Sequence, residues 1–184
     1  VSEWLRWELH PWKKSDGQIG GVILLVERIT DRKKAELALR ESEERFRNLA
    51  DSTPVLVWMT NANNECIYVN KTWLEFTGST LDEELNTGWS RHLAQEDLQY
   101  TWNVYNQAAL SRQPFDMVYR LKRHDGAIRW ILMQANPRIL PDGSLAGYIG
   151  TCTDITDLKE TQEKLALSSA KFQSVLDAAT QVSI

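Results

Sequence analysis

The chain has 184 residues, with 21 basic and 25 acidic side chains, a formal net charge of −4 and a sequence pI of about 5.5. Nucleic acids and anionic membranes attract basic surfaces, so this balance argues against both as partners. The longest apolar run, residues 22–26, is far shorter than the roughly 20 residues of a membrane-spanning helix. We therefore expect a soluble, cytoplasmic fragment without membrane contact.

The two cysteines, Cys66 and Cys152, are isolated and lack the spacing of a disulfide framework or a zinc site. We expect both to be small, buried or half-buried side chains in a reducing cytoplasm. The sequence also lacks a nucleophile paired with a base, a metal-ligand cluster and a glycine-rich phosphate loop. We therefore expect no catalytic residue, no metal site and no enzyme activity in this fragment.

The N-terminal part of the chain recurs further along it at a constant offset of 126 positions, in order and without a gap. The matching pairs are Trp4/Trp130, Pro11/Pro137, Asp16/Asp142, Gly17/Gly143, Gly21/Gly147, Ile29/Ile155, Thr30/Thr156, Asp31/Asp157, Leu39/Leu165, Phe46/Phe172 and Asp51/Asp177. A fixed period is typical of a tandem array. It predicts the end of one module, one complete module and the start of a third.

Residues 1–30 contain two extended runs joined at Gly17, which predicts a β-hairpin because glycine readily adopts the positive φ of a tight turn. An isolated hairpin is marginally stable in water, and this one carries Trp4, Trp7 and Trp12. We expect it to pack on another surface, such as the sheet of a partner subunit. Residues 31–52 follow as a charged linker helix.

Residues 55–60 and 66–69 predict a second hairpin, and helical segments follow at 71–76, 81–85 and 96–110. Asn70 can cap the first of these helices, and Gly78 can end it. Three longer strands at 115–123, 127–140 and 144–153 are joined by Asp-Gly turns, which indicates an antiparallel meander. This order predicts an α+β fold, a five-stranded antiparallel sheet with helices on one face.

Residues 158–184 form a predicted exit helix whose side chains repeat every seven residues. Two such sets occur, Leu158, Leu165, Phe172 and Ala179, and Thr161, Ser168, Val175 and Val182. The double set is typical of a coiled-coil seam, which predicts a homodimer. The alternative is that the helix packs on its neighbouring sheet.

The central module also contains a series of short motifs. They are Tyr68-Val69-Asn70, Trp73, Phe76-Thr77-Gly78, Tyr119-Arg120-Leu121, Arg123-His124-Asp125-Gly126, Arg129-Trp130, Gly147, Gly150 and Asp154-Ile155-Thr156. Together they resemble the PAS fold with its C-terminal PAC segment, as found in bacterial sensor histidine kinases and diguanylate cyclases. The resemblance implies four parts: 1–30 as the C-terminal hairpin of a preceding PAS module, 31–52 as a linker helix, 53–157 as a complete PAS/PAC domain, and 158–184 as an exit helix leading into a following PAS module.

The resemblance also implies a signal junction at Asp154, Ile155 and Thr156, between the sheet and the exit helix. In the preceding partial copy Arg28 stands at the position of Asp154. That difference predicts that the first junction transmits a signal differently or not at all.

Known cofactors of the family can be compared with this chain position by position. The haem-ligating histidine of the long helix corresponds to Tyr100, and the cysteine of the flavin photosensors has no counterpart in residues 87–92. The resemblance therefore argues against histidine-ligated haem and a cysteinyl-flavin adduct, and leaves noncovalent flavin or another small molecule open.

A pocket between helices and sheet is the expected ligand site. Its candidate residues are Trp58, Trp73, Tyr100, Tyr119, Trp130, Gln134 and Tyr148, and Trp102 and Met133 are further side chains available to line it. The alternative is a closed core, and strand alternation leaves open which sheet face points inward.

The resemblance implies a cytoplasmic sensory or relay module of a multidomain signal-transduction protein. Its partners would be a second copy, neighbouring PAS domains and an output domain outside the fragment, with a small molecule as possible ligand. The alternative is a ligand-free dimerisation and spacer module.

Overall fold

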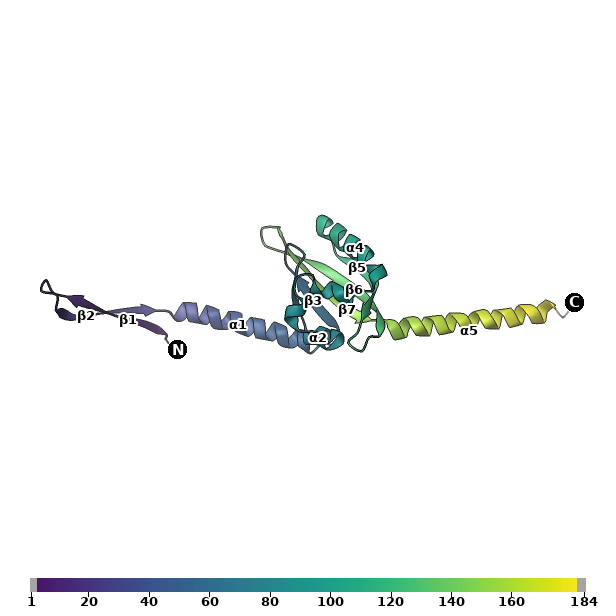
Figure 1. Cartoon of the computed structure of the whole chain (residues 1–184), viewed down its shortest axis with the longest axis horizontal. Coiled ribbons are helices and arrows are strands. Elements are labelled where there is room, and N and C mark those ends of the chain that lie inside the picture. Colours follow the sequence, from purple (N-terminus) through teal and green to yellow (C-terminus); the bar gives the residue numbers. More distant parts are fainter. Residues whose placement is uncertain (1–2, 182–184) are drawn as a thin grey trace. The chain divides into compact units, whose positions relative to one another are not determined.

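The structure, a computed structural model, describes residues 3–181 of the chain and side chains as far as Ser174 (Figure 1). The chain divides into two compact units between Leu49 and Ala50. Residues 1–2 of the predicted hairpin and 182–184 of the predicted exit helix lie outside the described residues. The same holds for the predicted seam position Val182 and for the side chains of Val175 and Ala179.

The first unit begins with an antiparallel hairpin of β1 (Leu5–Lys13) and β2 (Ile19–Arg28), followed by α1 (Thr30–Asp51). Gly17 has a φ of 83° in the connecting turn, a value that glycine adopts without strain. Thr30 Oγ1 accepts a hydrogen bond from the backbone N–H of Trp4 at 2.9 Å, and Ile29 N–H donates to the Trp4 carbonyl at 2.9 Å. These bonds tie the start of α1 to the start of β1.

The second unit contains a five-stranded antiparallel sheet in the order β4-β3-β7-β6-β5. Its strands are β3 (Leu56–Thr60), β4 (Cys66–Val69), β5 (Phe115–Lys122), β6 (Ile128–Ile139) and β7 (Leu145–Asp154). The turns at Gly126 and Gly143 join β5 to β6 and β6 to β7, with φ values of 87° and 81°. Both turns lie where the Asp-Gly pairs predict them.

Between β4 and β5 lie α2 (Lys71–Thr77), α3 (Leu81–Glu84), the 3-10 turns η1 (Gly88–His92) and η2 (Gln95–Asp97), and α4 (Leu98–Ser111); α5 (Thr156–Gln181) follows the sheet. Side chains from α2, η1 and α4 share one buried cluster with the sheet. This confirms the predicted α+β fold. Within residues 3–181, no helix combines the length and apolar character needed to cross a membrane.

Strand alternation decides which sheet face points inward. Six odd-numbered side chains in β5 and β6 are at most 3% exposed: Met117, Tyr119, Leu121, Ile131, Met133 and Ala135. Even-numbered neighbours such as Trp130 and Gln134 therefore lie on the opposite face.

Asn70 fixes the position of α2 from inside the fold. Its Oδ1 accepts hydrogen bonds from the backbone N–H groups of Trp73 and Val57 at 3.1 and 2.9 Å. Its Nδ2 donates to the carbonyls of Ala50 and Val55 at 2.8 and 3.0 Å. The predicted helix cap is therefore also a fully buried link between α2, β3 and the segment before β3.

Candidate functional site

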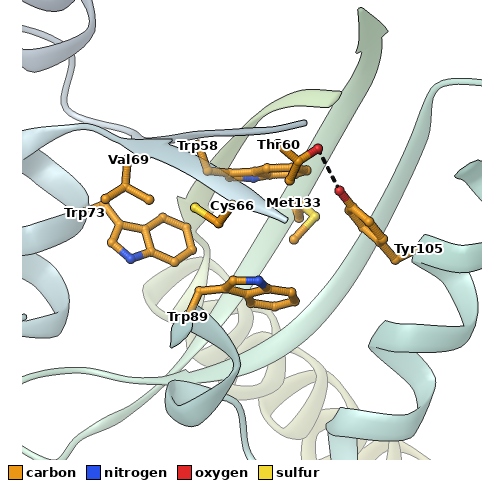
Figure 2. A pocket seen from close by; sticks show the side chains of 8 residues that line it. All are labelled: Trp58, Thr60, Cys66, Val69, Trp73, Trp89, Tyr105 and Met133. Carbon is orange, nitrogen blue, oxygen red and sulfur yellow. Dashed lines mark hydrogen bonds between the residues drawn. The ribbon is translucent and has the colours of Figure 1, made fainter. Parts of the chain in front are cut away.

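A small cavity of about 20 Å³ lies between the inner sheet face and the helices (Figure 2). It is lined by Trp58, Thr60, Cys66, Val69, Trp73, Trp89, Tyr105 and Met133. A cavity of this volume accommodates about one water molecule. A larger ligand can enter only if one of the lining side chains moves.

The two hydroxyl groups of the cavity are hydrogen-bonded to each other. Tyr105 Oη donates to Thr60 Oγ1 at 2.9 Å, as the dashed line in Figure 2 shows, and the Tyr148 backbone N–H donates to the same oxygen at 2.9 Å. Burial raises the pKa of Tyr105 to about 12, so its hydroxyl stays neutral at physiological pH. The cavity is therefore an apolar space with one hydroxyl pair at its wall.

Cys66 contributes a thiol to the same wall. Burial raises the pKa of this thiol to about 11, and the Sγ lies 3.6 Å from the carbonyl of Tyr68. Because the thiolate is the reactive form, Cys66 acts here as a small apolar side chain.

One cavity side chain is held by a buried carboxylate. Glu84 is fully buried, and its Oε2 accepts a hydrogen bond from Trp73 Nε1–H at 2.9 Å. Its Oε1 lies 2.8 Å from His92 Nε2 and 3.2 Å from Arg91 Nη2. Burial alone would raise the pKa of Glu84, but hydrogen bonds from His92 and Trp73 outweigh it, so the pKa lies below its usual value.

An ion-pair cluster joins the sheet to α5. Arg129 Nε lies 2.7 Å from a carboxylate oxygen of Asp154 at the end of β7, and its Nη2 lies 3.0 Å from Asp157 in the first turn of α5. Burial alone would raise the pKa of Asp154, but hydrogen bonds from Arg129 and Thr156 hold it below its usual value. The carboxylate is therefore charged at neutral pH and paired.

The backbone of Trp130 makes a second link at the same place. Its N–H donates to Thr156 Oγ1 at 2.8 Å, and its carbonyl accepts from Ile155 N–H at 2.8 Å. The Lys159 ammonium lies 4.6 Å from the centre of the Trp130 ring, which is within cation–π range. The first turn of α5 is therefore attached to β6 by both backbone and side chain.

This arrangement of sheet, cavity and exit helix matches a known fold. The family model described as PAS fold matches residues 44–155, more than half of the chain. The chain belongs to the PAS family. The resemblance drawn from the short motifs is thereby confirmed, and the PAS fold is a sensory rather than a catalytic one.

Two similar proteins are much longer than this chain. An uncharacterized protein of Sinorhizobium fredii, y4lL, is 36% identical over 169 residues, which cover 92% of this chain and 20% of that protein. The peroxide stress-activated histidine kinase mak1 of Schizosaccharomyces pombe is 30% identical over 169 residues, covering 83% of this chain and 10% of that protein. The PAS chain therefore corresponds to a fifth or less of the length of these relatives.

Two solved structures show the same fold. The PAS domain of a Colwellia psychrerythraea protein has a TM-score of 0.54 at 18% identity, covering 62% of this chain and 97% of that chain. The N-terminal domain of a diguanylate cyclase with PAS/PAC sensor from Marinobacter aquaeolei has a TM-score of 0.51 at 18% identity, covering 55% and 95%. At this identity the likeness shows the fold alone.

The structure brings together only part of the residue set that we predict for the PAS pocket. Trp58 and Trp73 line the cavity. Tyr119 and Tyr148 are fully buried elsewhere in the core, where Tyr119 Oη lies 3.4 Å from Cys152 Sγ and Tyr148 Oη donates to the Ala108 carbonyl at 2.6 Å. Both side chains thus belong to the core, and their hydroxyl groups contact other core atoms.

The other three predicted pocket residues do not line this cavity. Tyr100 is 50% exposed on α4, and Gln134 is exposed on the outer face of β6. Trp130 lies on the same outer face, between the guanidinium of Arg120 and the ammonium of Lys159. Strand alternation explains both β6 placements, because Trp130 and Gln134 alternate with the inward Ile131 and Met133.

The structure adds cavity residues that the sequence-based set omits. They are Thr60, Cys66, Val69, Trp89 and Tyr105, whereas Met133 lines the cavity as the sequence suggests. The helical spacing around Tyr105 could have indicated this residue. Trp89 lies in η1, a 3-10 turn without apolar periodicity, so no local pattern indicates it.

Proposed function

We propose that this PAS module senses or relays a signal within a larger cytoplasmic signalling protein and passes changes in its core to α5. The junction between β6 and α5 carries the proposal. Met133 lines the cavity, and three residues earlier on the same strand Trp130 binds the start of α5 through its N–H and its carbonyl. A shift of β6 at the cavity therefore moves atoms that hold the helix.

The coupling requires little energy. A two-state change biased by about 1–3 kcal/mol is the usual scale of communication between sites. The ion pairs of Arg129 with Asp154 and Asp157 are of the kind that can be made or broken within this range. Asp154, Ile155 and Thr156 thus act as the signal junction.

The signal is carried in a homodimer formed along α5. The seam positions Leu158, Leu165 and Phe172 are 57%, 71% and 67% exposed in the single chain. A row of large apolar side chains at seven-residue spacing is the pattern of a helix that pairs with another helix. The output activity, such as a histidine kinase or a diguanylate cyclase, lies outside this fragment, and the length of the kinase relative supports this placement.

The ligand is a small and mostly apolar molecule that enters by displacing a cavity side chain. Trp89 is the natural candidate for displacement, because η1 is short and held by few backbone hydrogen bonds. The cavity volume also favours a second candidate function, a ligand-free dimerisation and spacer module, because the resting cavity accommodates about one water molecule.

Native mass spectrometry of the purified chain distinguishes the two functions. For a sensor we expect a mass excess from a retained small molecule, present under native conditions and lost on denaturation. A native mass equal to that of the polypeptide, with an absorbance spectrum of tryptophan and tyrosine alone, would favour the spacer.

A further inference from the structure

The β1–β2 hairpin repeats the geometry of the β6–β7 hairpin position by position. At the offset of 126, the cross-strand pairs at both ends correspond: Leu5/Arg28 to Ile131/Asp154, and Lys13/Ile19 to Ile139/Leu145. The register shift before Lys13 corresponds to the one before Ile139. The first hairpin is thus built like two strands from the middle of a PAS sheet.

The two hairpins differ in what covers one of their faces. In β1–β2 the pairs Trp7/Val26 and Leu9/Leu24 lie directly opposite each other and share a face. This hairpin face carries Leu5, Trp7, Leu9, Val22, Leu24 and Val26, which are 47–67% exposed, together with Pro11 and Arg28. Its counterparts Ile131, Met133, Ala135, Tyr148 and Cys152 are at most 3% exposed.

The other face of the same hairpin is far more polar. Arg6, Glu8, His10 and Glu27 lie on it, together with Trp12, Ile23 and Leu25. A mostly apolar face opposite a face that carries most of the charged residues is the pattern of an antiparallel sheet with one buried side. Within the described residues, however, β1 and β2 pair only with each other.

We propose that the hairpin face is one half of a second PAS core, completed by residues that precede the hairpin in the same polypeptide. Those residues supply a strand antiparallel to β2 in the position of β3, a strand antiparallel to β1 in the position of β5, and a helix in the position of α4. In the complete module, β3 pairs with β7 and β5 pairs with β6 in this way.

Side-chain packing shows that the strand that pairs with β2 is not the β3 strand of a second copy of this chain. In the complete module Trp58 pairs with Gly150, and a Cβ added at Gly150 would lie 2.6 Å from the Trp58 ring. The hairpin has Leu24 at the position of Gly150. A strand with Trp58 would therefore collide with Leu24, so the occupant is a different segment with a smaller residue at that position.

Amide hydrogen exchange tests this proposal in the natural polypeptide. The chain of 184 residues is compared with one that also contains about 74 preceding natural residues, the length of the equivalent stretch 53–126. We expect exchange in residues 5–28 to be at least about 100-fold slower in the longer chain, because the strands become internal to a sheet. Equal exchange in both chains, or a natural polypeptide without such a preceding segment, would overturn the proposal.

A matched pair of variants in the longer chain tests whether slow amide exchange in residues 5–28 depends on burial of the hairpin face in particular. Leu24 and Leu25 are neighbours on β2 with 50% and 53% exposure in the single hairpin, and they lie on opposite faces. We expect Leu24→Lys to abolish the protection of residues 5–28 and Leu25→Lys to preserve most of it. Equal effects of the two substitutions would contradict the assignment of the hairpin face, and exchange in residues 56–154 reports whether the second module stays folded.

Discussion

Glu84 shows how a single residue can set the shape of the PAS cavity. Its carboxylate is fully buried, yet it binds the Trp73 indole on one oxygen and His92 with Arg91 on the other. A buried charge is tolerated only when it is paired and hydrogen-bonded. Glu84 thus fixes the indole that forms one wall of the cavity.

Replacing Glu84 by Gln should destabilise the module by about 1.5–3 kcal/mol at pH 7, because hydrogen bonds to a charged group are lost. The pKa of Glu84 is lowered, so its contribution is complete above the usual value of 4.5 and is lost as the pH falls through the folded-state pKa. Urea unfolding should therefore show that the free energies of unfolding of the natural chain and the Glu84→Gln variant differ less at pH 3.5 than at pH 7. Glu75→Gln, in an exposed ion pair with Lys71, is the control and should cost about 0.5 kcal/mol or less. A difference independent of pH would contradict a charged Glu84.

Residue-level predictions from the sequence succeed where the signal is local. Asn70 and Gly78 cap α2 as their spacing predicts, because a cap depends on residues within one turn. The cavity lining is different, since it depends on which strand face points inward and on the position of η1. Neither property is encoded in a short stretch of sequence, so Trp130 is misplaced and Trp89 is omitted.

At the scale of elements, the two strand-to-helix junctions share their backbone bonds and differ in charge. Trp4 with Ile29 and Thr30 repeats the hydrogen bonds that Trp130 makes with Ile155 and Thr156. The ion pair at the first junction is between Arg28 and Asp31, at 3.9 Å and exposed. The second junction has an Arg–Asp contact of 2.7 Å with both groups partly buried, which makes it the stiffer connection.

The proposed coiled-coil seam of α5 is tested by a pair of leucines. Leu165 is 71% exposed at a seam position, and Leu167 is 59% exposed two residues later, outside the seven-residue pattern. Leu165→Lys should weaken dimerisation at least about tenfold in sedimentation equilibrium, because it places two lysines against each other in the seam. Leu167→Lys should leave the dissociation constant within about twofold. Similar dimerisation of both variants would contradict the seam.

At the scale of the whole molecule, the fold was predictable because each element has its own signal. Alternation and Asp-Gly turns define β5, β6 and β7, and helical spacing defines α4. The constant offset of 126 predicts that the hairpin belongs to another copy of the module. The small cavity volume was not predictable, because it depends on how three tryptophans and a tyrosine fill one space.

The central claim is that a change in the cavity reaches α5 through β6. Trp89→Ala removes a cavity wall at a cost of about 3–5 kcal/mol, and added indole can refill the space left by the side chain. The Arg129→Gln variant weakens the junction, and Arg40→Gln, the control, removes an exposed ion pair with Glu44 on α1.

Amide exchange in residues 155–165 of the Trp89→Ala chain, with and without indole, is the most direct measurement. We expect that opening the cavity speeds this exchange at least about tenfold and that indole reverses the change. We also expect that combining Trp89→Ala with Arg129→Gln abolishes the indole response, whereas combining it with Arg40→Gln preserves the response. If indole raises the melting temperature of the Trp89→Ala chain but exchange in α5 stays the same throughout, the cavity and the helix are not coupled.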